Sequence, residues 1–150
     1  MKNLFLNNNV GIIGLGVLGS AIAENFINKN MSIAGYDINK KVFENLKNKK
    51  LKIYPSIKKI GIDCNFLITS LPSESSLINV SKLLIKNDKL IIIETSTLPL
   101  DCKLEAKNIL KEKKITLFDA PLSGNRIAAL DGKLSAYLSG IDKNKLDVES

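Results

Sequence analysis

The sequence predicts an α/β fold in which helices cover both faces of a mostly parallel, doubly wound β-sheet. Short apolar segments alternate with segments whose apolar residues recur at helical spacing, and this alternation is typical of βαβ units. One segment, Leu90–Ile93, is apolar without a break, as expected of a strand buried on both faces. The 150 residues, 45% hydrophobic and 25% charged, suit one domain, residues 1–150, with a substantial core.

The expected elements follow one another along the chain with short connections. Strands are predicted at Val10–Ile13, Ser32–Tyr36, Leu51–Tyr54, Phe66–Ser70, Leu90–Glu94, Ile115–Phe118 and Leu134–Leu138. Helices are predicted at Val17–Ile27, around Val42 and Leu46, at Glu74–Ile85 and at Pro99–Lys114, with a short helical turn at Ile57–Ile60 and a further helix from Asp142. Right-handed crossovers should join the parallel strands.

A glycine motif stands between the first strand and the first helix. The hexapeptide Gly14-Leu15-Gly16-Val17-Leu18-Gly19 has the pattern G-x-G-x-x-G. In such a turn Gly14 allows the tight bend, Gly16 lets a pyrophosphate approach the backbone, and Gly19 lets the helix pack against the strand. The free N–H groups of the helix then bind the phosphates, so the motif predicts a dinucleotide site, against the alternative of an ordinary glycine-rich turn.

Asp37 ends the second predicted strand, about 20 residues after the glycines, where the dinucleotide fingerprint places an acid that binds the adenosine ribose. A carboxylate there accepts from a free 2′-hydroxyl and repels a 2′-phosphate. We therefore expect NAD rather than NADP, although Lys40 and Lys41 would offset part of the repulsion. The alternative is that Asp37 only caps the next helix.

The apolar stretch from Val10 to Ala23 is also compatible with a secretory signal peptide. Against that alternative, the start is weakly basic, Asn7-Asn8-Asn9 interrupts the run, and the stretch is too short to span a membrane. Cys64 and Cys102 form no C-x-x-C pair, which predicts no disulfide framework and no metal site. We expect both to be packing residues in a reducing compartment, the cytoplasm.

The charge pattern argues against a nucleic-acid partner. The net charge is +7, but Arg126 is the single arginine and the lysines are dispersed, whereas nucleic-acid binders cluster arginine with aromatic residues. A basic surface would still attract an anionic cofactor or an acid substrate. The chain has no histidine, which excludes mechanisms that need an imidazole base from this chain.

Two further strand ends offer candidate binding residues. Ligands of such sheets bind beyond the carboxyl ends of the strands. Leu71 and Pro72 follow the fourth predicted strand, and the hydroxyls of Ser96 and Thr97, after the fifth, are candidates for binding a ribose or a nicotinamide. The alternative is that these residues only end the strands and cap the helices that follow.

Four motifs in order resemble the 3-hydroxyisobutyrate dehydrogenase branch of the β-hydroxyacid dehydrogenases, whose cofactor domain is of the Rossmann type, like that of 6-phosphogluconate dehydrogenase. They are the glycine motif, Phe66–Pro72, Glu94–Thr97 and Asp119–Gly124, the last followed by Ala128 and Gly132–Leu134. The resemblance runs from about Val10 to Gly140. It implies hydride transfer from a small 3-hydroxy acid to the nicotinamide of NAD or NADP.

The resemblance also implies roles for individual residues. The three motif glycines would hold the pyrophosphate, and Leu71, Pro72 and Thr97 would border the nicotinamide half. Ser123 and Gly124 would donate hydrogen bonds to the substrate carboxylate. Asn125 departs from the family, which has a second glycine there, and its bulk would alter substrate choice or weaken binding.

The largest departure concerns the general acid/base. In the family it is a lysine in a glycine-rich lysine-and-asparagine motif, which would fall beyond Ser150, and no lysine of this sequence matches that motif. The family's all-helical carboxy-terminal domain, which closes the site and makes the dimer, would also be missing. The implied partners are therefore a second copy of the chain or a missing carboxy-terminal half, and we expect negligible turnover because a positioned base contributes about 10²–10⁴-fold.

Three hypotheses stay open. The first is the amino-terminal half of a hydroxyacid dehydrogenase, present as a fragment, a truncated frame or one piece of a split enzyme. The second is a non-catalytic dinucleotide-binding module. The third is a basic protein that binds nucleic acid. Titration with NAD and NADP separates the third from the other two.

Overall fold

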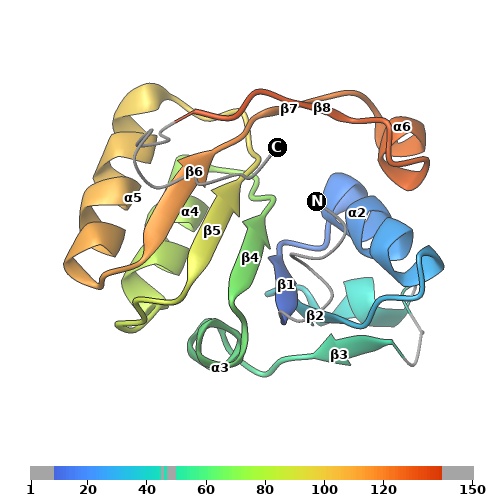
Figure 1. The fold of residues 1–150 in the computed structure, drawn as a ribbon, viewed down its shortest axis with the longest axis horizontal. Helices are drawn as coiled ribbons and strands as arrows, with labels where there is room; N and C mark the ends of the chain where they lie inside the picture. Colours follow the sequence, from blue (N-terminus) through green and yellow to red (C-terminus); the bar gives the residue numbers. More distant parts are fainter. Residues whose placement is uncertain (1–8, 45, 47–49, 140–150) are drawn as a thin grey trace, which may run out of the picture.

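The computed structural model describes residues 9–44, 46 and 50–139. Its main feature is a six-stranded, all-parallel sheet with the strand order β3-β2-β1-β4-β5-β6 (Figure 1). This is the order of a dinucleotide-binding doubly wound sheet. The strands are β1 (Val10–Ile13), β2 (Ile33–Tyr36), β3 (Leu51–Ile53), β4 (Phe66–Thr69), β5 (Ile91–Glu94) and β6 (Thr116–Asp119).

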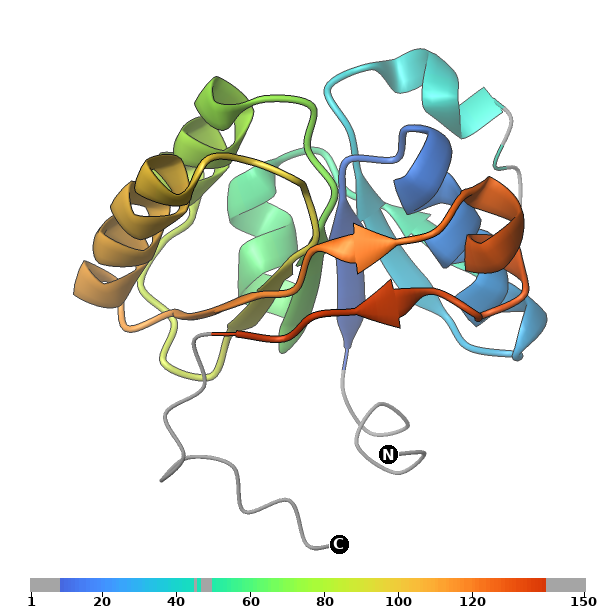
Figure 2. The same cartoon turned by 90° about the horizontal axis from the view of Figure 1, so that it is seen from above.

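Helices cover both faces of the sheet, which confirms the expected fold class (Figure 2). One face carries α3 (Ile57–Asp63), α4 (Glu74–Leu83) and α5 (Leu100–Glu112). The other carries α2 (Val17–Asn28), the 3₁₀ helix η1 (Lys40–Glu44) and α6 (Arg126–Leu130).

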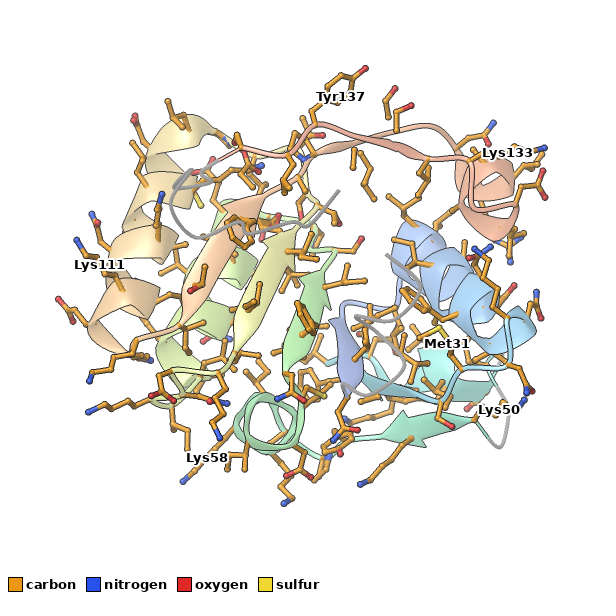
Figure 3. The ribbon with its side chains drawn as sticks, viewed as in Figure 1. Met31, Lys50, Lys58, Lys111, Lys133 and Tyr137 are labelled. Carbon is orange, nitrogen blue, oxygen red and sulfur yellow. The ribbon has the colours of Figure 1, made fainter. Side chains whose placement is uncertain are left out.

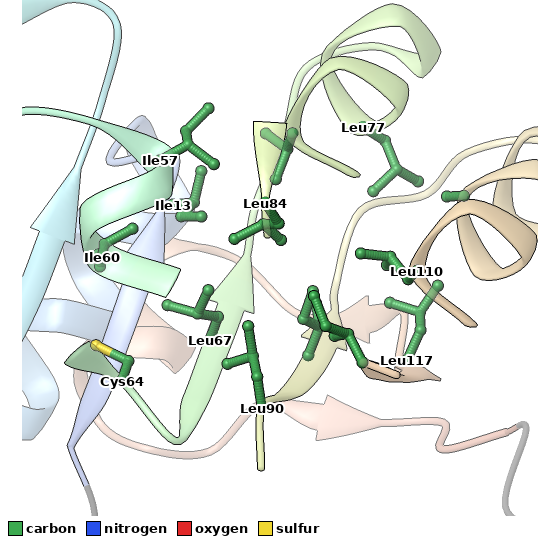
Figure 4. Close-up of a cluster of buried hydrophobic side chains, with 14 of the residues drawn as sticks. Ile13, Ile57, Ile60, Cys64, Leu67, Leu77, Leu84, Leu90, Leu110 and Leu117 are labelled. Carbon is green, nitrogen blue, oxygen red and sulfur yellow. The ribbon is translucent and has the colours of Figure 1, made fainter. Parts of the chain in front are cut away.

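The apolar residues divide into two cores, one on each face. On the first face, helix residues such as Leu77, Leu84 and Leu110 pack on Leu67 and Leu117 of the sheet (Figure 4). The second core joins β1 and β4 to α2 and α6. Because successive strand residues point to opposite faces, the fully buried strands β1 and β4 supply both cores.

The strand register brings the carboxyl ends of the strands together. Ile13 pairs with Tyr36 on one side and Thr69 on the other, and Thr69 pairs in turn with Glu94, which pairs with Asp119. The loops that follow these residues therefore lie along one edge, which is where the sequence places its candidate site residues.

The last predicted strand is not part of the main sheet. Only Ser135–Ala136 is extended there, as β8, and it pairs antiparallel with β7 (Leu122–Ser123) in a separate two-stranded sheet. The chain leaves β6, forms β7, turns through α6 and returns as β8 beside β7 (Figure 1). We call residues 122–136 the strap. Sequence periodicity missed β7 and α6, since each has five residues or fewer.

Three other expectations need correction. The helix around Val42 is the single 3₁₀ segment η1, with Leu46 outside it, whereas the turn from Ile57 extends into the helix α3. Strand β5 is not buried on both faces, since Ile91 and Ile93 are half-buried. They pack at the margin of the second core, as do the strap leucines Leu122 and Leu134. The helix predicted from Asp142 lies outside the described residues.

Lys50, Lys58, Lys111 and Lys133 lie at widely separated places on the outline of the molecule (Figure 3). The stretch from Val10 to Ala23, which the secretory alternative would remove, forms the central strand β1 and the first half of α2. None of the helices in the described part of the chain has the length and apolar character needed to cross a membrane.

Candidate functional site

The three motif glycines have different surroundings. A Cβ on Gly14, whose φ is +90°, would lie 2.1 Å from the carbonyl oxygen of Ser70, and a Cβ on Gly19 would lie 1.9 Å from that of Gly14. Gly16 has no atom within 4 Å of its Cβ position. Gly14 and Gly19 thus serve the tight turn and the helix contact, while Gly16 leaves open space for a ligand that approaches the backbone.

The amino terminus of α2 opens onto this space. Gly16 is the N-cap residue, no side chain caps the helix, and its first turn carries no acidic residue. The first N–H groups of a helix have no partner within it and carry partial positive charge. Val17, the first helical residue, is 72% exposed. The site therefore fits the phosphates of a dinucleotide.

Asp37 connects the second strand to the glycine turn. Its Oδ2 accepts a hydrogen bond from Leu15 N–H at 2.7 Å, and its Oδ1 accepts one from Asn39 N–H at 2.7 Å. The N–H of Gly14 also donates to the carbonyl of Tyr36 at 3.0 Å. Asp37 therefore stabilises both the turn before η1 and the glycine loop, and each oxygen keeps a further lone pair for a ligand hydroxyl.

A pocket of about 390 Å³ lies at this edge of the sheet. Of the predicted site residues it brings together Gly14, Gly16, Val17, Asp37, Leu71 and Pro72. Leu15, Leu18 and Gly19 do not line the pocket. Leu15 is fully buried, and Leu18 packs against the second core. Thr97, Ser123, Gly124 and Asn125 are exposed and are not among the lining residues.

Several lining residues escaped sequence analysis. They are Ile13, Tyr36, Ile38, Ile57, Ser70, Ser76, Asn79 and Val80. Tyr36 and Ile38 flank Asp37, so their place beside the acid is a signal that could have found them. Ile13 and Ser70 directly precede Gly14 and Leu71, which is a similar signal. The rest require the packing of α3 and α4 against the sheet, which a single sequence does not display; they are Ile57, Ser76, Asn79 and Val80.

Ser96 is placed differently from what its sequence position predicts. Its side chain is 9% exposed, and its hydroxyl is bonded to the protein rather than open to a ribose or nicotinamide. Thr97, one residue further, is exposed. Of the two hydroxyls at this strand end, that of Thr97 is the one available to a ligand.

The strap carries the candidate substrate residues and packs on α2. Gly124 has a φ of +137°, which favours glycine, and the Asn125 side chain caps α6 by accepting from Ala128 N–H at 3.0 Å. The Asn25 amide of α2 donates to the carbonyl of Leu130. Ser123 thus belongs to β7 and Gly124 forms the bend that follows it, and the Asn125 amide oxygen is engaged within the strap.

The cysteines are packing residues in this fold. Both are buried and unpaired. Burial raises the pKa of the Cys64 thiol to about 11, and burial also raises that of Cys102, so neither forms a reactive thiolate. Over the described ranges no group of three or more His, Cys, Asp and Glu residues could hold a metal ion.

Comparison with known proteins agrees with this geometry. The family model of the "NAD binding domain of 6-phosphogluconate dehydrogenase" matches residues 9–149. A probable mitochondrial 3-hydroxyisobutyrate dehydrogenase of Dictyostelium discoideum is 27% identical over 140 residues, which are 90% of this chain and 44% of that protein. Its counterpart in Arabidopsis thaliana is 30% identical over 150 residues, 88% of this chain and 43% of that protein.

Solved structures show the same fold. The 3-hydroxyisobutyrate dehydrogenase of Mycobacterium tuberculosis, described with L-serine, superposes with a TM-score of 0.81 at 17% identity, over 90% of this chain and 47% of that one. That of Salmonella typhimurium gives 0.77 at 23% identity, over 89% and 48%. The chain thus spans less than half the length of these relatives. It belongs to the family of NAD binding domains of 6-phosphogluconate dehydrogenase, as the match over residues 9–149 shows.

Proposed function

We propose that this chain binds NAD as the cofactor-binding part of a 3-hydroxyisobutyrate dehydrogenase-like β-hydroxyacid dehydrogenase. The observation that carries the proposal is the open space over Gly16, between the uncapped start of α2 and the Asp37 carboxylate. Phosphates would lie on the N–H groups of Val17, Leu18 and Gly19. Asp37 would accept a hydrogen bond from the adenosine ribose.

The rest of the dinucleotide would follow the sheet edge. From Asp37 at β2, the register runs through the glycine turn at β1 to Leu71 and Pro72 after β4 and Thr97 after β5. We place the nicotinamide beside these last three residues. When bound, the nicotinamide supplies the hydride acceptor; the chain's own residues bind and orient.

The substrate would be a small 3-hydroxy acid, as the names of the relatives suggest. L-serine, with which the Mycobacterium tuberculosis protein is described, is itself such an acid. In our proposal the Ser123 hydroxyl and the Gly124 N–H donate to the substrate carboxylate, and the net charge of +7 favours anionic ligands. Asn125 takes part as the cap that shapes this turn.

NAD is proposed over NADP because Asp37 carries negative charge where a 2′-phosphate would lie. One structurally similar protein is described with NADP⁺, so both cofactors belong in the test. Isothermal titration should give a dissociation constant below millimolar for NAD and weaker binding for NADP. No binding of either below millimolar would refute the proposal.

We propose further that the 150-residue polypeptide turns over negligibly by itself. Among the described residues that line the pocket, none is a lysine. A lysine base of the kind that the resemblance implies is thus not part of this lining. Incubation with 3-hydroxyisobutyrate and NAD should give no steady formation of NADH; sustained formation would refute this part.

The non-catalytic dinucleotide module remains the second candidate, favoured by the same pocket lining. A lysine-bearing helical segment supplied in trans, as a carboxy-terminal half, would restore turnover in the first case and not in the second.

For location we propose the cytoplasm from the two free, buried cysteines, although several relatives are named as mitochondrial.

A further inference from the structure

A buried polar network lies beyond the pocket, at the carboxyl ends of β4, β5 and β6. Its centre is Glu94, whose side chain is completely buried. Glu94 Oε1 accepts from Ser96 N–H at 2.7 Å, and Oε2 accepts from the Thr69 hydroxyl at 3.0 Å. Burial raises the pKa of this carboxyl above its usual range. A buried carboxyl at this position serves some purpose, since an apolar side chain would pack there without the desolvation cost.

The network reaches the pocket through a single side chain. The Ser96 hydroxyl accepts a hydrogen bond from the backbone N–H of Leu71 at 2.8 Å and donates toward Glu94 Oε2 at 3.4 Å. Leu71 and Pro72 form the pocket wall that follows β4. The Leu71 N–H lies beyond the last residue of β4, Thr69, where backbone pairing between strands has ended. Its hydrogen bond to Ser96 therefore fixes the position of the backbone in this part of the pocket wall.

Ser96 is itself held from a second side. Its carbonyl accepts from Lys103 Nζ at 2.7 Å, and the same ammonium pairs with the Asp119 carboxylate at the end of β6. Lys103 is 7% exposed, and hydrogen bonds made by buried charged groups resist rearrangement. The backbone N–H, the carbonyl and the hydroxyl of Ser96 are therefore all hydrogen-bonded within the protein.

We propose that Ser96 is a positioning residue, whose hydroxyl fixes the backbone of Leu71 at the wall of the dinucleotide pocket while Glu94 and Lys103 hold Ser96 in place. This inference rests on the proposed function, since it assumes that a dinucleotide occupies the pocket. Ser96 touches no ligand in this arrangement. It acts through Leu71.

Ser81 provides a matched control. It is also a buried serine, 1% exposed, and its hydroxyl donates to the carbonyl of Leu77 at 2.9 Å. It does not line the pocket. Ser81→Ala therefore removes one buried hydroxyl of the same kind without touching the wall.

The experiment combines NAD titration with amide hydrogen exchange measured by NMR. Ser96→Ala should weaken NAD binding about three- to tenfold, the value of one hydrogen bond, and should accelerate exchange of the Leu71 amide at least tenfold. Ser81→Ala should leave the NAD affinity within twofold. Ser96→Cys, which keeps the volume but offers only a weak acceptor, should lie between Ser96→Ala and the wild type and serves if the alanine variant does not fold.

Equal loss of affinity in the Ser96 and Ser81 variants, or an unchanged Leu71 exchange rate in Ser96→Ala, overturns the inference. If the wild type binds neither NAD nor NADP, the proposed function fails instead. The Leu71 exchange rate then still decides whether Ser96 holds this backbone.

Discussion

Two alanine substitutions in the glycine motif should separate folding from cofactor binding. At Gly19 an added Cβ would lie 1.9 Å from the carbonyl oxygen of Gly14. This oxygen belongs to the backbone and cannot move aside as a flexible side chain would. Helix α2 must move away from β1 to relieve this overlap. At Gly16 the added Cβ meets no atom within 4 Å, and the backbone φ of −67° suits alanine.

The expected magnitudes differ accordingly. Overpacking of this kind costs about 3 kcal/mol, the upper end of the usual range, which lowers the melting temperature of a domain of this size by about 6–12 °C for Gly19→Ala. For Gly16→Ala the loss of a good N-cap and the lower entropy of the unfolded chain nearly offset each other, within about 1 kcal/mol. The new methyl group, however, fills the space where a pyrophosphate would approach. Loss of one or two charge-assisted hydrogen bonds weakens NAD binding about 10- to 100-fold.

Thermal unfolding followed by circular dichroism, together with calorimetric titration of NAD, measures both effects on the same samples. The reasoning requires a crossed result: Gly19→Ala unstable, and Gly16→Ala stable but weak in binding. A Gly16 variant that binds NAD like the wild type would refute the assignment of the open space to the pyrophosphate. A Gly19 variant as stable as the wild type would show that α2 does not need its close approach to β1.

Three further predictions follow from single contacts. Asp37→Asn should raise the affinity for NADP relative to NAD, and should lower the free energy of unfolding by about 1–3 kcal/mol because one oxygen cannot serve both backbone N–H groups; an unchanged ratio of calorimetric affinities counts against the assignment. Glu94→Gln should gain stability relative to the wild type as the pH rises from about 4 to about 8: the pKa of Glu94 is raised by burial, so the wild type loses stability as the pH rises through it, whereas glutamine does not titrate. Denaturant unfolding across that range checks the sign, and a gain on lowering the pH would contradict it. Asn25→Ala should remove the bond to the Leu130 carbonyl and speed proteolysis within the strap while leaving NAD affinity within twofold; equal proteolysis rates would mean that the Arg126–Glu24 ion pair and the apolar contacts are sufficient to hold the strap.

The sheet and the glycine turn could be predicted from sequence because their signals are local. β1 is four buried apolar residues followed at once by the glycines, and the acid ends the next strand. The strap could not be predicted, because β7 and β8 are two residues each and exist only through pairing with one another. Leu134–Leu138 carries a strand-like pattern, but it adds no parallel strand beside β6. The chain meets β6 just after this segment, where Ser139 forms an isolated antiparallel bridge with Asp119.

The candidate site divides along the same line. Gly14, Gly16, Asp37 and Leu71 were found from strand ends and meet in one pocket. The pocket walls formed by α3 and α4 depend on how these helices pack against the sheet. No residue type in the sequence indicates which of their residues face the pocket. Ser96 shows the opposite difficulty: a serine after a strand suggests a free hydroxyl, yet its burial and its bond to Leu71 depend on a neighbouring strand.

Asp37 shows why the two interpretations of the fingerprint acid, ligand group and cap, are not exclusive. One oxygen caps the turn before η1 and the other holds Leu15 inside the glycine loop, so the loop is stabilised without any cofactor. A carboxylate oxygen accepts more than one hydrogen bond, and therefore a ribose can add to these contacts rather than displace them. Under the proposed function the same charge would select NAD, and a substitution at Asp37 would then change loop stability and cofactor choice together. The coupling rests on the 2.7 Å bond from the Leu15 N–H, which joins the acid that follows β2 to the glycine loop that follows β1.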